Sequence, residues 1–204
     1  MVSINKGMMN YKFYFFAGFS ILLSTITYSQ DCKFKENSFD KSTNVSTLIS
    51  DEIKVFGSLT DGGSFSVKKS EDKYFIVLDY NVTKASNNIS ISKFPVINKV
   101  GQGDKLIIKS TNDQTITLTA SKDVVMKSNM VPNLNNVYSY KLSNIHYLIS
   151  EDNLKSIQGS LISSISLEYR TDGDDNTIYT FDYSEIKEKT AIKLNGLINC
   201  ILNN

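Results

Sequence analysis

The sequence predicts an α+β fold: an antiparallel sheet of about six to eight strands, with a short helix and a C-terminal helix packed on one face. Apolar and polar residues alternate with a period of two over much of residues 53–149, and clusters rich in Gly, Asp and Asn separate the alternating runs. Two later stretches carry apolar residues at helical spacing. A closed barrel or sandwich, with the last helix covering an opening, is the alternative architecture.

The first predicted strands are a hairpin and a central strand. Ile53–Leu59 and Ser64–Lys69 flank Asp61-Gly62-Gly63, where glycine supplies the positive φ that tight hairpin turns require. Tyr74–Val82 is the most apolar stretch after residue 30, so we expect it at the centre of the sheet. Ile89–Ile97 is a weaker strand because it contains a proline.

Three more strands are expected before the first helix. Lys105–Ser110 and Thr115–Ala120 lie on either side of a polar turn, and the second alternates threonines with aliphatic residues, which is typical of a half-buried strand. Val124–Asn136 has no regular pattern and is expected to be irregular. Val137–Ile149 alternates again.

The C-terminal part contains both predicted helices. Ser150 is expected to cap the short helix, because its hydroxyl can accept a hydrogen bond from a first-turn amide. Ile165–Arg170 and Thr177–Tyr183 form a hairpin, and the last helix runs from about Ser184 to Leu202. The apolar stripe of the short helix consists of Leu154, Ile157 and Leu161.

The N-terminus predicts export. Phe13–Ile26 is apolar, too short to span a bilayer, and preceded by Lys6 and Lys12. Residues 1–29 are therefore interpreted as a signal peptide and 30–204 as a single β-rich domain, periplasmic or secreted, with no membrane span after cleavage. The true start codon stays open, because the methionines at positions 8 and 9 each leave a sufficient signal. A buried core helix or an uncleaved anchor is the alternative.

Two cysteines remain after the predicted cleavage, Cys32 and Cys200, near opposite ends of the domain. An even count in an oxidising compartment predicts a disulfide between them. Two unpaired thiols, or pairing between molecules, are the alternatives. A metal site needs more ligands than these cysteines and the single His146 provide, so we expect no metal and no cofactor.

The charge of the predicted domain argues against nucleic acid as a partner. Removing Lys6 and Lys12 from the 22 basic residues leaves 20 against 21 acidic ones. Arg170 is the only arginine, and no basic stripe is present. Because nucleic-acid binders concentrate arginine and lysine on one face, we do not expect nucleic acid as a partner.

Aromatic residues suggest a possible ligand face. Tyr138 and Tyr140 alternate along one strand, and Tyr179 and Phe181 along another. If exposed, these rings could stack on a sugar or line an apolar cavity, whereas rings covered by the helices are simply core.

Carboxylates and the histidine are the remaining candidates for chemistry. Asp79, within the central strand, and Glu168 form a possible acidic pair for acid–base hydrolysis, although Asp79 on the open face of the sheet is the simpler interpretation. His146 lies on a predicted strand without a nucleophile motif. The loop after Thr171 resembles a calcium loop at its first positions but lacks the required Gly and Glu, which favours a hairpin turn. No catalytic residue is predicted.

The segment Tyr147-x-Ile149-Ser150-x-x-x-Leu154, the following hairpin and the lysine-rich terminal helix ending in Cys200 resemble small exported proteins of Bacteroidetes with no assigned function. The resemblance covers about the last 70 residues and implies no activity or site residue. The sequence thus favours a non-enzymatic exported protein that binds an unknown protein or a small apolar ligand. A carboxylate-dependent hydrolase is the alternative.

Overall fold

The computed structural model describes residues 32–58, 61–85, 92–132, 134, 136–171 and 174–204. Within them, Cys32–Asn204 form one unit. The predicted signal peptide, residues 1–29, lies outside the described residues and stays a prediction.

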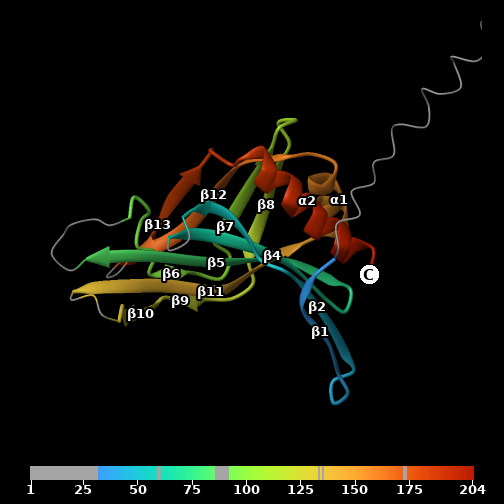
Figure 1. Cartoon of the computed structure of the whole chain (residues 1–204), viewed down its shortest axis with the longest axis horizontal. Coiled ribbons are helices and arrows are strands. Elements are labelled where there is room, and N and C mark those ends of the chain that lie inside the picture. The colour runs from blue at the N-terminus through green and yellow to red at the C-terminus, as the bar shows by residue number, and fades with distance from the viewer. Residues whose placement is uncertain (1–31, 59–60, 86–91, 133, 135, 172–173) are drawn as a thin grey trace, which may run out of the picture. The chain divides into compact units, whose positions relative to one another are not determined.

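Thirteen strands and two helices make up the described chain (Figure 1). The strands are β1 (Phe34–Asp40), β2 (Val45–Ser50), β3 (Ile53–Gly57), β4 (Gly62–Ser70), β5 (Lys73–Ala85), β6 (Lys99–Val100), β7 (Lys105–Ser110), β8 (Thr115–Ala120), β9 (Val124–Val125), β10 (Lys127–Met130), β11 (Val137–Ile149), β12 (Ile162–Thr171) and β13 (Asp174–Tyr183). The helices are α1 (Glu151–Gln158) and α2 (Glu188–Leu202).

The antiparallel sheet with a short helix and a C-terminal helix is confirmed, but the predicted number of six to eight strands is wrong. The alternating segments produce eight strands: β3, β4, β5, β7, β8, β11, β12 and β13. No bounds were predicted for β1 or β2. Nearly all of β1 is exposed, so no apolar face marks it. β6, β9 and β10 have only two to four residues each, and the last two lie in the segment expected to be irregular.

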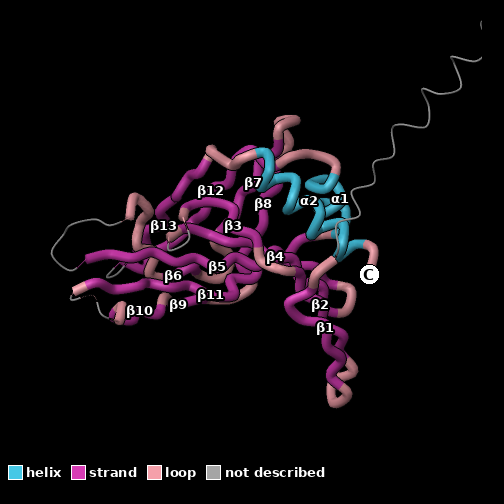
Figure 2. The backbone as a smooth tube through the Cα atoms, in the orientation of Figure 1, coloured by secondary structure: helices cyan, strands magenta, loops and turns pink. Residues whose placement is uncertain are grey.

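All strand pairs are antiparallel, and the main path of the sheet runs β1-β2-β4-β5-β11-β8-β7-β12 (Figures 1 and 2). β3 pairs with β4, and β13 pairs with β12. The ring of Phe56 on β3 lies 5.6 Å from that of Phe181 and 5.2 Å from that of Tyr183, both on β13. The sheet therefore curls until side chains from its β3 and β13 edges meet.

The inner face of the curled sheet is filled by side chains. Alternation along β5 turns Tyr80 and Leu78 inward and leaves Asp79 on the outer face. β11 keeps the same pattern through a bulge between Leu142 and Ile145, which lets both of these residues face the core. The two helices add their apolar stripes to the same core cluster. The core is thus solid.

The helices lie next to each other at one end of the sheet (Figure 2). α1 begins after Ser150, whose Oγ accepts a 3.2 Å hydrogen bond from the Asn153 amide, as predicted. α2 begins at Glu188 rather than Ser184, because Lys187 has the extended conformation of an N-cap. It contacts β2, β3, β4 and β12 and so bridges strands from both ends of the sheet path.

Cys32 and Cys200 form the predicted disulfide, with Cα atoms 5.5 Å apart and a sequence separation of 168. The bond joins Cys32, two residues before β1, to the last turn of α2. It therefore anchors the base of the β1–β2 hairpin, which projects from the rest of the sheet (Figure 1). Within the described residues, neither helix has the length and apolar character needed to cross a membrane.

Candidate binding cleft at the sheet edge

A surface depression with an aromatic floor lies where β13 and the end of β3 face each other. It consists of two adjoining hollows of about 330 and 220 Å³, both lined by Lys93, Phe94 and Tyr183. The first hollow is completed by Gly57, Ser58, Asp61 and Ser92. The second is completed by Phe181, Asp182, Ser184 and Glu185. We call the two together the edge cleft.

One wall of the edge cleft is an irregular segment held by hydrogen bonds. Within the weak strand candidate Ile89–Ile97, residues 89–91 lie outside the described residues, and Ser92–Ile97 is not a strand. The Phe94 amide donates to the Ser92 Oγ at 3.2 Å, and the Tyr80 hydroxyl donates to the Pro95 carbonyl at 2.6 Å. Burial raises the pKa of Tyr80, so this hydroxyl stays a donor. The segment is tied to the core through β5.

The floor of the edge cleft is aromatic. Phe94 packs with its ring centroid 5.8 Å from Phe181 and 5.7 Å from Phe56. Tyr183 lies beside them, 6.5 Å from Phe94, and burial raises its pKa above the ordinary value. Ring pairs at these separations stabilise the packing beyond the effect of their buried area.

The opposite wall is the hairpin connection between β3 and β4. Gly57 and Gly62 have φ of +92° and +113°, and a Cβ on Gly57 would lie 2.0 Å from the Asp61 carbonyl oxygen, so only glycine fits. The Asp61 side chain is 7% exposed and accepts a 2.8 Å hydrogen bond from the Thr83 amide. This bond fixes the connection to β5.

Charged side chains surround the aromatic floor. Lys93 is exposed and its Nζ lies 5.6 Å from the centre of the Phe94 ring. Asp182 and Glu185 are exposed on the other side. The edge cleft therefore combines an apolar floor with a rim that can make ionic contacts to a partner.

The predicted ligand face divides into two places. Tyr138 and Tyr140 lie 6.4 Å apart on β11, whereas Tyr179 packs 5.8 Å from Tyr169 on β12. Phe181 belongs to the edge cleft. Three strands, β8, β7 and β12, separate β11 from β13 along the sheet, and among the described residues no ring contact joins the two groups. Phe181 thus lines the cleft, together with Tyr183, the next residue of the same alternating run, whereas Tyr138, Tyr140 and Tyr179 do not line either hollow.

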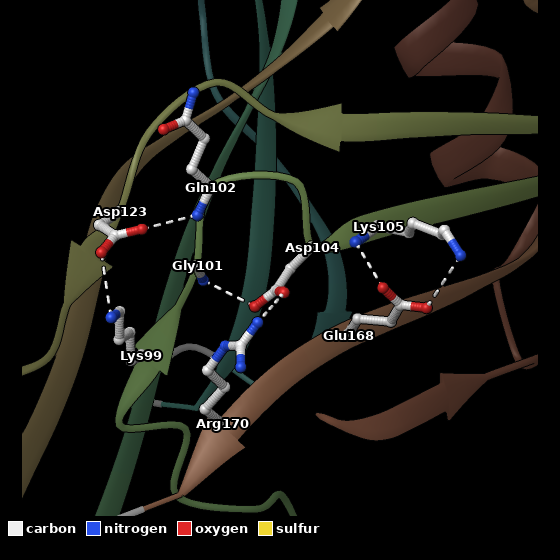
Figure 3. Close-up of polar contacts among 8 residues, drawn as sticks. All are labelled: Lys99, Gly101, Gln102, Asp104, Lys105, Asp123, Glu168 and Arg170. Atoms are coloured by element: carbon white, nitrogen blue, oxygen red, sulfur yellow. Dashed lines mark hydrogen bonds and ion pairs between the residues drawn. The ribbon is translucent and has the colours of Figure 1, made fainter. Parts of the chain in front are cut away.

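The possible acidic pair is not brought together. Asp79 accepts a 2.8 Å hydrogen bond from the Asn144 amide at the β11 bulge. Glu168 on β12 accepts from the Lys105 amide at 2.9 Å and lies 3.7 Å from the Lys105 Nζ (Figure 3). Four strand steps separate β5 from β12, or about 19 Å along the sheet. That spacing exceeds the separation of catalytic carboxylates in glycosidases.

No family model matches this chain, and no curated protein or solved structure matches it either. The resemblance to exported proteins of Bacteroidetes therefore stays a prediction, and the function has to be inferred from the site.

A buried ion pair that the sequence did not predict lies beside Glu168 (Figure 3). Asp104 is 2% exposed; one of its oxygens accepts from the Arg170 guanidinium and the other from the Gly101 amide, at 2.8 and 2.7 Å. A solitary arginine inside a strand was the available signal, but its partner comes from a turn 66 residues away. Because the pair satisfies its own charges, we interpret it as structural.

His146 lies on the outer face of β11, with its ring centroid 5.6 Å from that of Phe75. Its pKa is lowered from 6.5, first by burial and then by the positive charges of Lys68 and Lys122, while Asp79 opposes the shift. These effects favour the neutral imidazole, and among the described contacts it has no nucleophile partner.

We expect nuclear magnetic resonance titration of this single histidine to give a pKa below 6.5. The pKa of His146 is lower in the folded protein than in the unfolded chain. The stability that this difference contributes is therefore complete above pH 6.5, and it is lost as the pH falls through the folded pKa. Lys68→Gln should move the pKa back toward 6.5, since it removes one repelling charge. A measured value at or above 6.5 in the native protein would contradict this account.

Proposed function

We propose that this chain is a non-enzymatic exported protein of the cell envelope or extracellular space, and that it binds a partner protein through the edge cleft. The observation that carries the proposal is the cleft itself, an aromatic floor with charged residues on both sides, at the edge of the sheet. Phe181 and Tyr183 are partly exposed at this floor. Aromatic side chains surrounded by polar residues are characteristic of protein interfaces.

Export is supported by the signal-like sequence at residues 13–26 and is compatible with the disulfide between Cys32 and Cys200. Stable disulfides belong to oxidising compartments such as the periplasm or the extracellular space.

A partner protein fits the edge cleft better than a small apolar ligand does. Carriers of apolar molecules enclose most of the ligand in an apolar cavity. Here the inner face of the sheet is filled, with Tyr80, Tyr147 and Phe65 at most 1% exposed. The cleft instead lies at the surface, with Lys93, Asp182 and Glu185 on its rim. The hydrolase alternative has no comparable support, because Asp79 and Glu168 are held apart.

Site-specific photo-crosslinking in the cells that produce the protein tests the proposal. A benzophenone amino acid replacing Lys93 should capture a discrete partner protein, because position 93 lines both hollows of the cleft. The same group replacing Thr117, an exposed residue of β8, is the matched control and should capture none.

The adduct from position 93 should disappear in the Asp182→Lys background, which changes the opposite side of the cleft. Equal capture from positions 93 and 117, or no capture from position 93, would refute the proposed site. An adduct that adds only the mass of a small molecule would show that the cleft holds an apolar ligand instead.

A further inference from the structure

The second hollow of the edge cleft lies beside the last three residues of β13. Successive residues of a strand point to opposite faces, so a depression over one face touches alternate residues. The second hollow instead touches Phe181, Asp182 and Tyr183 in succession, and then Ser184 and Glu185. A depression that reaches consecutive residues lies beside the strand. Within the described residues, β13 pairs with β12 alone, so this side of β13 is a sheet edge.

β13 differs from the other long edge of the sheet. β1 carries Lys35, Glu36 and Asp40 and has a register shift near its start. Charges and bulges of this kind prevent pairing with other chains. β13 instead has an uncharged run from Asn176 to Phe181, in which Ile178 is 50% and Tyr179 39% exposed. The run is rich in residues that favour strands, so β13 is an edge suited to accept another strand.

We propose that the partner inserts an extended segment into the edge cleft and pairs its backbone with β13 as an additional strand. This inference rests on the function proposed above and specifies how the partner is recognised. Backbone hydrogen bonds to β13 give affinity, as in other cases of strand addition, and side chains of the added strand that face inward contact Phe94 and Tyr183 on the cleft floor.

The charge of β13 indicates the composition of the added strand. The strand contains three aspartates and no basic residue, and Glu185 follows it. Pairing with β13 of a second copy would place two acidic strands side by side, and like charges across strands are destabilising. A segment that carries lysine or arginine would be attracted instead. The occupant is therefore a basic, extended segment of a different protein.

Panning of random decapeptides against the full protein, with its disulfide intact, provides the probe. We expect the selected peptides to be rich in β-branched and basic residues and to lack proline. A strand pairs through one edge only, because alternate amides point to opposite sides. N-methylation of one alternate set of peptide amides should weaken the Kd at least tenfold, and methylation of the other set should change it less than twofold.

Two further measurements place the bound peptide. Hydrogen exchange should slow at amides between Ile178 and Asp182 when the peptide binds. Asp182→Lys should weaken the selected basic peptide at least tenfold, whereas Glu36→Gln on β1 is the matched control and should leave the Kd unchanged. Melting temperatures of both variants confirm that they are folded.

The outcomes separate this inference from the function on which it rests. Equal effects of the two methylation sets, or unprotected β13 amides, would overturn strand addition. The cleft function survives in that case if Lys93→Glu still changes the Kd of the selected peptides. If neither Lys93→Glu nor Asp182→Lys changes the Kd of the selected peptides, both proposals are overturned. The protein alone could also sediment as a dimer whose β13 amides are protected from exchange. That result would show that a second copy occupies the cleft, and it would overturn the proposal of a basic partner segment.

Discussion

Replacing Cys32 and Cys200 together by serine is expected to lower the free energy of unfolding by about 3–5 kcal/mol. The disulfide closes a loop with a sequence separation of 168, so its removal greatly enlarges the ensemble of unfolded conformations. For a domain of this size the loss corresponds to a decrease of roughly 6–20 °C in the melting temperature. Urea and thermal unfolding of the double variant provide the measurement.

The single variants are the appropriate controls. Cys32→Ser and Cys200→Ser each break the same bond, so each should lose nearly as much stability as the double variant. Reduction of the native protein should reproduce the loss, while the double variant should not respond to reductant. A native protein whose unfolding midpoint is the same with and without reductant would contradict the expected contribution.

Asp104→Ala is expected to destabilise the protein by about 3–5 kcal/mol, because one member of a buried ion pair remains without the other. The substitution removes the acceptor of both the Arg170 guanidinium and the Gly101 amide. Arg170 is largely buried, with 18% of its side chain exposed, so solvent compensates little. Urea unfolding of the native protein and the variant measures the difference.

A double-mutant cycle tests the cause of this loss. Asp104→Ala combined with Arg170→Met should cost less than the sum of the two single changes, since no charge is left behind. Asp123→Ala is the matched control in the same region: Asp123 binds the Gln102 amide and Lys99, but it is exposed, so its loss should be much smaller (Figure 3). Additive single effects would show that the pair is not coupled.

The parts of the fold that were predictable are those where each strand buries one face. β7, β8 and β11 have the predicted bounds, because buried and more exposed residues alternate over most of each strand. β1 is exposed on both faces and leaves no such pattern. β6 consists of Lys99 and Val100, whose pairing depends on strands that arrive later in the chain. Only the tertiary structure defines those elements.

The candidate site was predictable only in part, for a related reason. Phe181 could be identified because it alternates with Tyr179 on a strand. Phe94 could not, because Pro95 makes its segment irregular. Hydrogen bonds from β5, such as that from the Tyr80 hydroxyl to the Pro95 carbonyl, hold the segment in place, and the Phe94 ring packs against Phe181 on β13. The pairing of Asp79 with Glu168 failed for the opposite reason: their chemistry suits a pair, but the order of strands keeps them apart.

The disulfide has a consequence for proteolysis of the folded chain. Any single cut in the backbone between Cys32 and Cys200 leaves both pieces in one covalent molecule, because the bond joins the two ends of the folded unit. The pieces also continue to share a sheet in which strands from distant parts of the sequence are neighbours, such as β5 with β11. A protease would therefore have to cut this chain at least twice before any part of the region between the cysteines could be released.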